Sequence, residues 1–134
     1  MKKYLLDTNI CVYFLNGKYD LANKIDLIGF ENCSVSEVTI AELKYGSEKS
    51  SFKEKNRKII ESFQLLIDII PIFPALDVYA KEKARLKTKG MMLDDFDLLI
   101  GATAIYNEMI LVTKNKSDFE RMEKIEIEDW TEIR

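Results

Sequence analysis

The chain has 134 residues, a formal net charge of −3 and 47% hydrophobic residues, which suits one compact domain covering residues 1–134 and excludes a disordered chain. It contains no histidine, and this excludes a Ser-His-Asp triad, a Cys-His dyad, RNA cleavage by a histidine base and a zinc site with histidine ligands. Any acid–base chemistry must therefore come from carboxylates, lysines, tyrosines or a metal-bound water.

The expected elements alternate between strands and helices along the whole chain. In chain order they are a strand at 4–6, helices at 9–15 and 20–28, a strand at 33–35, a helix at 37–47 capped by Ser36, and a long amphipathic helix at 51–67. A strand at 69–73 follows, then a charged helix at 77–88, a helix at 94–107, a strand at 109–112, a short helix at 116–122 and a strand at 125–127. Pro71 favours an edge position for the strand that contains it. This alternation predicts an α/β fold with a parallel sheet covered by helices on both faces.

The sequence gives little sign of compartment or of partner. No apolar stretch is long enough to span a membrane, and Asp7 interrupts the apolar start too early for a signal peptide, so we expect a cytoplasmic protein. Cys11 and Cys33 lack metal-binding or redox spacing and are expected to be buried thiols. The negative net charge does not indicate nucleic acid, and the basic clusters within 49–58 and 81–89 are either solvated helix faces or phosphate contacts.

Oxygen-bearing side chains follow two of the predicted strands directly. Asp7 comes after the first strand, and Asn115 and Asp118 come shortly after the strand at 109–112. In parallel α/β sheets, ligands bind beyond the carboxyl ends of the strands. These side chains are therefore candidates for one site.

Two further acids occupy the apolar sides of predicted helices. Helical periodicity places Glu42 beside Val38 and Thr39, and it places Asp97 beside Ile100 on the side that packs inward. A carboxylate buried in such a place must be paired, protonated or bound to a metal.

Each acid also has a structural explanation. Asp7 could cap the following helix, Asp97 could form a capping-box-like pair with Asp94, and Glu42 could pair with a lysine. Capping does not explain Glu42, nor does it explain several acids near one site. A hard divalent cation with oxygen ligands, such as Mg²⁺, fits the whole set.

Four motifs along the chain resemble those of PIN-domain proteins. They are the opening segment at 5–10, the segment at 36–46, the segment at 94–102, and the closing segment at 111–119 followed by 128–130. The resemblance covers essentially the whole chain, and it points to the VapC-type toxins of prokaryotic toxin–antitoxin pairs.

This resemblance implies a three-layer α/β/α sandwich with a five-stranded parallel sheet. It also implies a site for Mg²⁺ or Mn²⁺ formed by Asp7, Glu42 and Asp97. Relatives carry a fourth acid near the end of the chain, for which we favour Asp118, with Asn115 as a neutral helper. Polar positions that line the site in relatives correspond to Thr8, Asn9 and Thr113.

The resemblance also implies a metal-dependent endoribonuclease that cleaves a structured RNA, binds a small antitoxin protein and forms a homodimer. Val12, Tyr13 and Phe14 are candidate partner contacts if they are exposed. The alternative is a non-catalytic RNA- or protein-binding module with the same fold. An aspartyl-phosphate enzyme or receiver domain would need a second acid beside the nucleophile, and a two-carboxylate glycosidase would need a larger sugar cleft.

Overall fold

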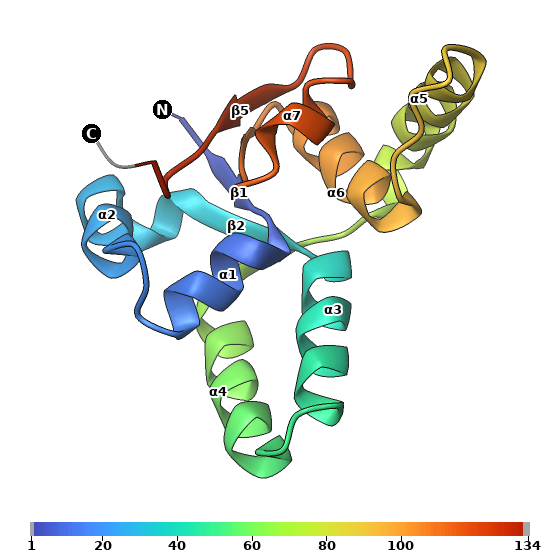
Figure 1. Cartoon of the computed structure of the whole chain (residues 1–134). Helices are drawn as coiled ribbons and strands as arrows, with labels where there is room; N and C mark the ends of the chain where they lie inside the picture. Colours follow the sequence, from blue (N-terminus) through green and yellow to red (C-terminus); the bar gives the residue numbers. More distant parts are fainter. Residues whose placement is uncertain (1, 133–134) are drawn as a thin grey trace.

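The computed structural model describes residues 2–132 and contains one five-stranded parallel sheet (Figure 1). The strand order is β3-β2-β1-β4-β5, and all four strand pairs are parallel. The strands are β1 (Tyr4–Leu6), β2 (Cys33–Ser36), β3 (Asp68–Ile70), β4 (Ile110–Val112) and β5 (Glu126–Glu128). The first strand therefore lies at the centre of the sheet, with β4 beside it, so the segments that follow β1 and β4 meet at one edge.

Each of the four connections between these strands contains at least one helix. They are α1 (Thr8–Leu15), α2 (Leu21–Ile28), α3 (Glu37–Glu48), α4 (Lys53–Leu66), α5 (Leu76–Thr88), α6 (Asp95–Tyr106) and α7 (Lys116–Phe119), with 3₁₀ turns η1 (Phe30–Asn32) and η2 (Phe73–Ala75). The helices α3 and α6 begin at the capping residues predicted from the sequence. The Ser36 side chain accepts a hydrogen bond from the backbone N–H of Val38, and the Asp94 side chain accepts one from the backbone N–H of Phe96.

Helices cover both faces of the sheet, which confirms the predicted α/β/α arrangement. Successive residues of a strand point to opposite faces, and in β1 the fully buried Leu5 and Leu6 belong to different apolar clusters. The Leu6 cluster contains residues of α1, α2 and α4, whereas the Leu5 cluster contains residues of α5, α6 and α7. Each face therefore has its own core.

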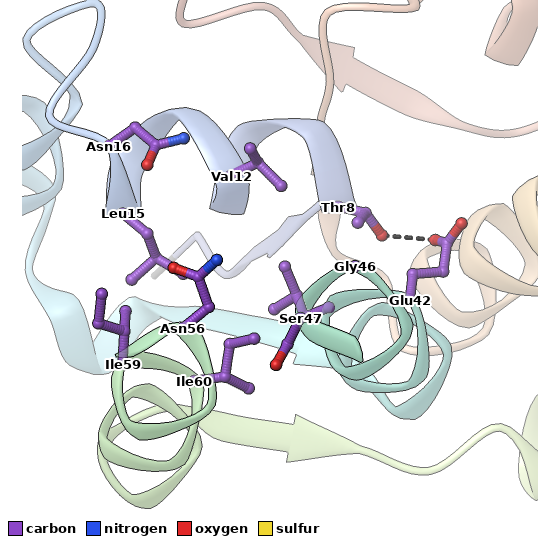
Figure 2. Close-up of a pocket in the computed structure, with 11 residues that line it drawn as sticks. Thr8, Val12, Leu15, Asn16, Glu42, Gly46, Ser47, Asn56, Ile59 and Ile60 are labelled. Atoms are coloured by element: carbon purple, nitrogen blue, oxygen red, sulfur yellow. Dashed lines mark hydrogen bonds between the residues drawn. The ribbon is translucent and has the colours of Figure 1, made fainter. Parts of the chain in front are cut away.

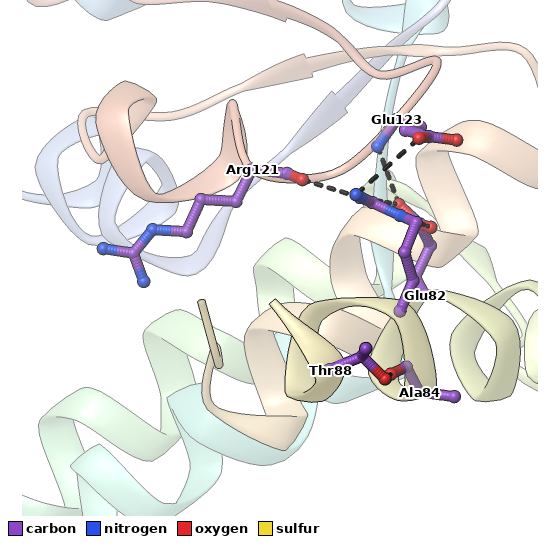
Figure 3. A network of polar contacts seen from close by, with 6 residues as sticks. Glu82, Ala84, Thr88, Arg121 and Glu123 are labelled. Carbon is purple, nitrogen blue, oxygen red and sulfur yellow. Dashed lines mark hydrogen bonds and ion pairs between the residues drawn. The ribbon is translucent and has the colours of Figure 1, made fainter. Parts of the chain in front are cut away.

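Buried polar contacts fix α5 against the segment that precedes β5 (Figure 3). Glu82 on α5 is 8% exposed and accepts two hydrogen bonds from the guanidinium of Arg85, at 2.8 and 3.0 Å. The same carboxylate accepts the backbone N–H of Glu123, and Arg85 donates to the carbonyl of Arg121. This network lowers the pKa of Glu82, chiefly through the hydrogen bond from Arg85.

Several sequence predictions differ from the structure only at element ends. The strand predicted at 69–73 is the edge strand β3, as Pro71 indicated, but it ends at Ile70 because proline has no N–H with which to continue the pairing. The helix predicted at 116–122 stops at Phe119. Both cysteines are buried free thiols, as predicted. None of the helices within residues 2–132 has the length and apolar character needed to cross a membrane.

Candidate active site

Asp7 belongs to the site through its carboxylate, and each of the two carboxylate oxygens accepts a hydrogen bond. Its backbone N–H donates to the carbonyl of Val112 at 2.9 Å, which continues the β1–β4 pairing to the end of the strands. Its Oδ2 accepts a hydrogen bond from Thr113 Oγ1 at 2.7 Å, and its Oδ1 accepts the backbone N–H of Thr8 at 2.8 Å. Asp7 therefore caps α1, as its structural explanation predicted. It also contacts Thr113, which directly follows β4.

The environment of Asp7 opposes its negative charge. The side chain is only 4% exposed, and burial raises the pKa of the Asp7 carboxyl. The hydrogen bonds from Thr113 and Thr8 lower that pKa and partly offset burial, while the charge of Glu42 raises it further. Each carboxylate oxygen keeps a free lone pair after these bonds, so Asp7 can still accept a cation.

Thr8 joins Asp7 to Glu42. The Thr8 hydroxyl donates to Glu42 Oε1 at 2.6 Å, as Figure 2 shows, and the buried Thr39 hydroxyl lies 3.0 Å from Thr8 Oγ1. Glu42 lies on the side of α3 that carries the buried Val38 and Thr39, as predicted, but its own side chain is only half-buried. The Glu42 side chain itself lines a pocket. Within residues 2–132 Glu42 forms no ion pair, which removes the lysine-pairing explanation.

The pKa of Asp97 is affected by the charges of the other site acids. It lies in the first turn of α6 and is half-buried. Burial raises the pKa of its carboxyl, and the negative charges of Asp7, Asp94, Glu42 and Asp118 raise it further, in that order, to about 6. The helix cap is Asp94, whose carboxylate accepts the backbone N–H of Phe96. In the described part of the chain no hydrogen bond reaches the Asp97 carboxylate, so the capping-box explanation is not supported.

The two candidates for the fourth position differ in what they contact. Asp118 on α7 is half-buried, and its charge contributes to the raised pKa of Asp97. Its Oδ1 lies 3.7 Å from Arg121 Nη2, so the carboxylate is turned partly toward a cation of its own segment. Asn115 is exposed, and its backbone N–H donates to Thr113 Oγ1 at 3.0 Å. Asp118 therefore bears on the electrostatics of the site, whereas Asn115 supports the loop.

The chemistry of these donors suits a hard divalent cation. Among residues 2–132, no three acidic or cysteine side chains already lie together as a metal-binding group. Mg²⁺ needs only one or two direct protein carboxylates, because water and phosphate oxygens complete its shell. The pKa of Asp97 is raised by burial and by repulsion from the neighbouring acids, and a cation among them would relieve that repulsion. In the first turn of α1, two residues after Asp7, the buried Asn9 Oδ1 accepts no hydrogen bond within the described residues, so one oxygen acceptor there has no partner.

Some features of the site were not visible in the sequence. The Thr39 hydroxyl and the pocket between α1, α3 and α4 depend on contacts between residues far apart in the chain. This pocket has a volume of about 230 Å³, and Figure 2 shows it opening beside Thr8 and Glu42. Asn56 and Ile59 line its far side from α4. Sequence periodicity could show that α4 is amphipathic but not which helix it faces.

Residues 4–125 match the family model of the PIN domain, and the chain belongs to this family. Within it, the chain belongs to the VapC-type ribonuclease toxins. It is 36% identical to ribonuclease VapC2 of Rickettsia felis, with 95% of this chain and 97% of that protein covered. It is 35% identical to the tRNA(fMet)-specific endonuclease VapC of Shigella flexneri, with 98% and 100% covered.

Solved structures show the same likeness. A structure of DNA-bound VapBC from Salmonella typhimurium superposes with a TM-score of 0.89 at 30% identity, covering 97% of this chain and 99% of that one. A structure of VapBC2 from Rickettsia felis bound to a promoter DNA fragment gives a TM-score of 0.88 at 34% identity, covering 95% and 98%. The predicted fold, the PIN-domain family and the ribonuclease class are therefore confirmed.

Proposed function

We propose that this VapC-type ribonuclease hydrolyses RNA with Mg²⁺ or Mn²⁺ held by Asp7, Glu42, Asp97 and Asp118. The observation that carries the proposal is geometric: Thr8 links Asp7 to Glu42 by hydrogen bonds at the end of β1. The pKa of the half-buried Asp97 carboxyl, raised by burial and by the charges of nearby acids that include Asp7 and Glu42, supports it. A bound divalent ion would supply positive charge and Lewis acidity at the phosphodiester.

The protein's own groups have separate tasks in this proposal. Thr113 and Thr8 hold both oxygens of Asp7 in fixed directions, so this ligand is ordered before any ion arrives. The Thr8 hydroxyl orients Glu42 in the same way. Asp97, with a pKa of about 6, is mostly ionised above neutral pH and loses its charge in mild acid. Protons therefore compete with the metal ion for this carboxylate, so we expect the metal concentration needed for half-maximal cleavage to rise as the pH drops below about 6.

The substrate we propose is a structured RNA of the transfer-RNA class. The support is the 35% identity with the Shigella flexneri relative, which is named as tRNA(fMet)-specific and is matched over its full length. An RNA substrate also agrees with action in the cytoplasm. The experiment is cleavage of a tRNA(fMet) transcript and of a ribosomal RNA stem-loop by the purified protein. Activity should require Mn²⁺ or Mg²⁺, disappear in EDTA and return on re-addition, whereas undiminished cleavage in chelator would contradict the metal site.

We propose further that a small antitoxin protein binds over the pocket between α1, α3 and α4. The support comes from relatives whose structures are VapBC complexes and from apolar side chains exposed at this pocket. Val12 and Ile59 line it and are 40% and 37% exposed. Of the other two contacts expected from the sequence, Tyr13 packs against Tyr19 and Phe14 against Phe63, so neither is freely exposed. Val12→Asp should therefore weaken antitoxin binding, and unchanged binding would place the partner elsewhere.

Homodimer formation is proposed on a different surface. Apolar side chains are exposed near the start of α6, where Phe73, Met92 and Phe96 are 80%, 43% and 47% exposed. A patch of this kind is typical of a protein interface. Sedimentation should detect a dimer whose dissociation increases on Phe96→Asp, and a monomer at high concentration would contradict the proposal.

A further inference from the structure

Three side chains beside the acidic site form a compact cluster that the proposed metal site does not use. Lys114 Nζ donates to the hydroxyl of Tyr19 at 2.9 Å and lies 5.3 Å and 5.1 Å from the ring centroids of Tyr13 and Tyr19. The two rings meet nearly edge to face, with centroids 4.9 Å apart and planes at 74°. We call these three residues the tyrosine–lysine cluster.

The cluster adjoins the acids through both of its elements. Lys114 stands between Thr113, which donates to Asp7, and Asn115, whose backbone N–H donates to Thr113. Tyr13 lies on α1, the helix that Asp7 caps, and six residues of helix rise correspond to about 9 Å. An RNA strand whose phosphate lies at the acids would therefore pass close to the cluster.

The backbone under the cluster is held in an unfavourable conformation. Tyr19 and Asp20 have φ values of +58° and +55°, in the left-handed region that residues with a Cβ rarely adopt, and neither is glycine. In this conformation Tyr19 is 42% exposed and lies beside the exposed Lys114. Strained backbone of this kind concentrates at functional sites, where it presents a side chain in a required position.

The chemistry of the cluster suits a nucleotide. The hydrogen bond from Lys114 to Tyr19, together with charge interactions with the phenol groups of Tyr13 and Tyr19, raises the pKa of Lys114, so its ammonium stays charged. An ammonium has three donors, and the bond to Tyr19 occupies one. Proteins bind single-stranded RNA by stacking bases on exposed aromatic rings and by pairing phosphates with cations. A cation is also needed here because the neighbouring acids repel RNA.

We propose that the tyrosine–lysine cluster is an RNA subsite, in which Tyr19 stacks on an unpaired base next to the cleaved bond and Lys114 binds an adjacent phosphate. The edge-to-face contact with Tyr13 supports the Tyr19 ring. This proposal rests on the proposed RNase function and specifies how the same site holds its substrate.

The test combines cleavage kinetics with binding of a fluorescein-labelled oligoadenylate, followed by anisotropy in EDTA so that the RNA is not cut. Tyr19→Leu should weaken binding and raise KM by about tenfold with little change in kcat, because it removes one stacked base. Tyr19→Phe keeps the ring and should stay within about twofold of the wild type. Lys114→Met should flatten the dependence of log Kd on log salt by about 0.7, the contribution of one phosphate contact to a single strand.

Matched controls lie at the opposite end of the strands. Tyr106→Leu removes a tyrosine that is 52% exposed at the end of α6, and Lys124→Met removes an exposed lysine before β5. Neither should change RNA affinity, and thermal melts of all variants would show that they are folded.

The outcomes separate this proposal from the proposed function. If the wild type cleaves no RNA with any metal, the proposed function fails. If it cleaves RNA but Tyr19→Leu and Lys114→Met keep wild-type KM, affinity and salt dependence, the subsite is refuted and the cluster only fastens two loops. Weaker binding of the antitoxin with unchanged RNA affinity would likewise refute it. A loss with Tyr19→Phe equal to that with Tyr19→Leu would show that the hydroxyl bond, and not stacking, matters.

Discussion

Replacing Asp97 by asparagine should stabilise the metal-free protein while abolishing its activity. The pKa of Asp97 rises from 3.8 to about 6 on folding, because of burial and of four neighbouring acids. Since the folded pKa exceeds the unfolded one, ionising Asp97 costs the folded state free energy at neutral pH. The difference of about two pH units corresponds to about 3 kcal/mol, which partial exposure to solvent reduces to about 1–2 kcal/mol.

Asparagine keeps the shape and never ionises, so Asp97→Asn should raise the free energy of unfolding in EDTA by about 1–2 kcal/mol above pH ~6. In a chain of this size, the melting temperature should rise by about 3–6 °C. The gain should shrink between pH ~6 and ~4 and disappear below, where Asp97 is neutral in both folded and unfolded chains. Asp26→Asn, an exposed acid on α2, is the control and should show no such pH-dependent gain.

With bound metal, the wild type should become more stable than Asp97→Asn, the reverse of their order in EDTA. Saturating Mn²⁺ should raise the melting temperature of the wild type, because ligand binds only the folded state, and should have little effect on Asp97→Asn. Cleavage of the tRNA transcript by the variant should fall by about two orders of magnitude or more, in line with the loss of a charged ligand. The reasoning would be refuted by a variant that matches the wild type in stability at every pH and also cleaves at the wild-type rate.

Three further predictions concern other parts of the site and its support. Asp118→Asn should reduce cleavage by about 100-fold and Asn115→Ala by only a few fold in single-turnover assays, and the reverse order would assign the fourth position to Asn115. Thr113→Val should lower the free energy of unfolding by about 1–2 kcal/mol in urea titrations, because it leaves a buried carboxylate oxygen without its donor, and Thr113→Ser should recover most of it. Glu82 has a folded pKa below 4.5, so its bond to Arg85 should stabilise the protein above that pH and less as the pH falls below it. Glu82→Gln should therefore cost about 1–3 kcal/mol at neutral pH, and equal stability of the two proteins in neutral urea titrations would contradict this.

The sequence alone determined the order of elements and the class of the protein. Periodicity and caps are local signals, so Ser36 and Asp94 indicated where α3 and α6 begin, and Pro71 indicated an edge strand. The absence of histidine narrowed the acid–base chemistry to carboxylates, lysines, tyrosines or a metal-bound water, and four motifs in order along the chain gave the family.

Only the tertiary structure decided how the side chains of the site act on one another. Helical periodicity placed Glu42 on the apolar side of its helix, but it could not show which element packs against that side. In the structure Glu42 lines a pocket together with Thr8, whose hydroxyl donates to its carboxylate. The pKa of Asp97 is likewise raised by burial and by the charges of Asp7, Glu42 and Asp118 on other segments, which no local pattern records. The cluster of Lys114 with Tyr19 joins residues 95 positions apart. Contacts of this range are set by the packing of the sheet and its helices, so they follow from the fold and not from neighbouring residues in the chain.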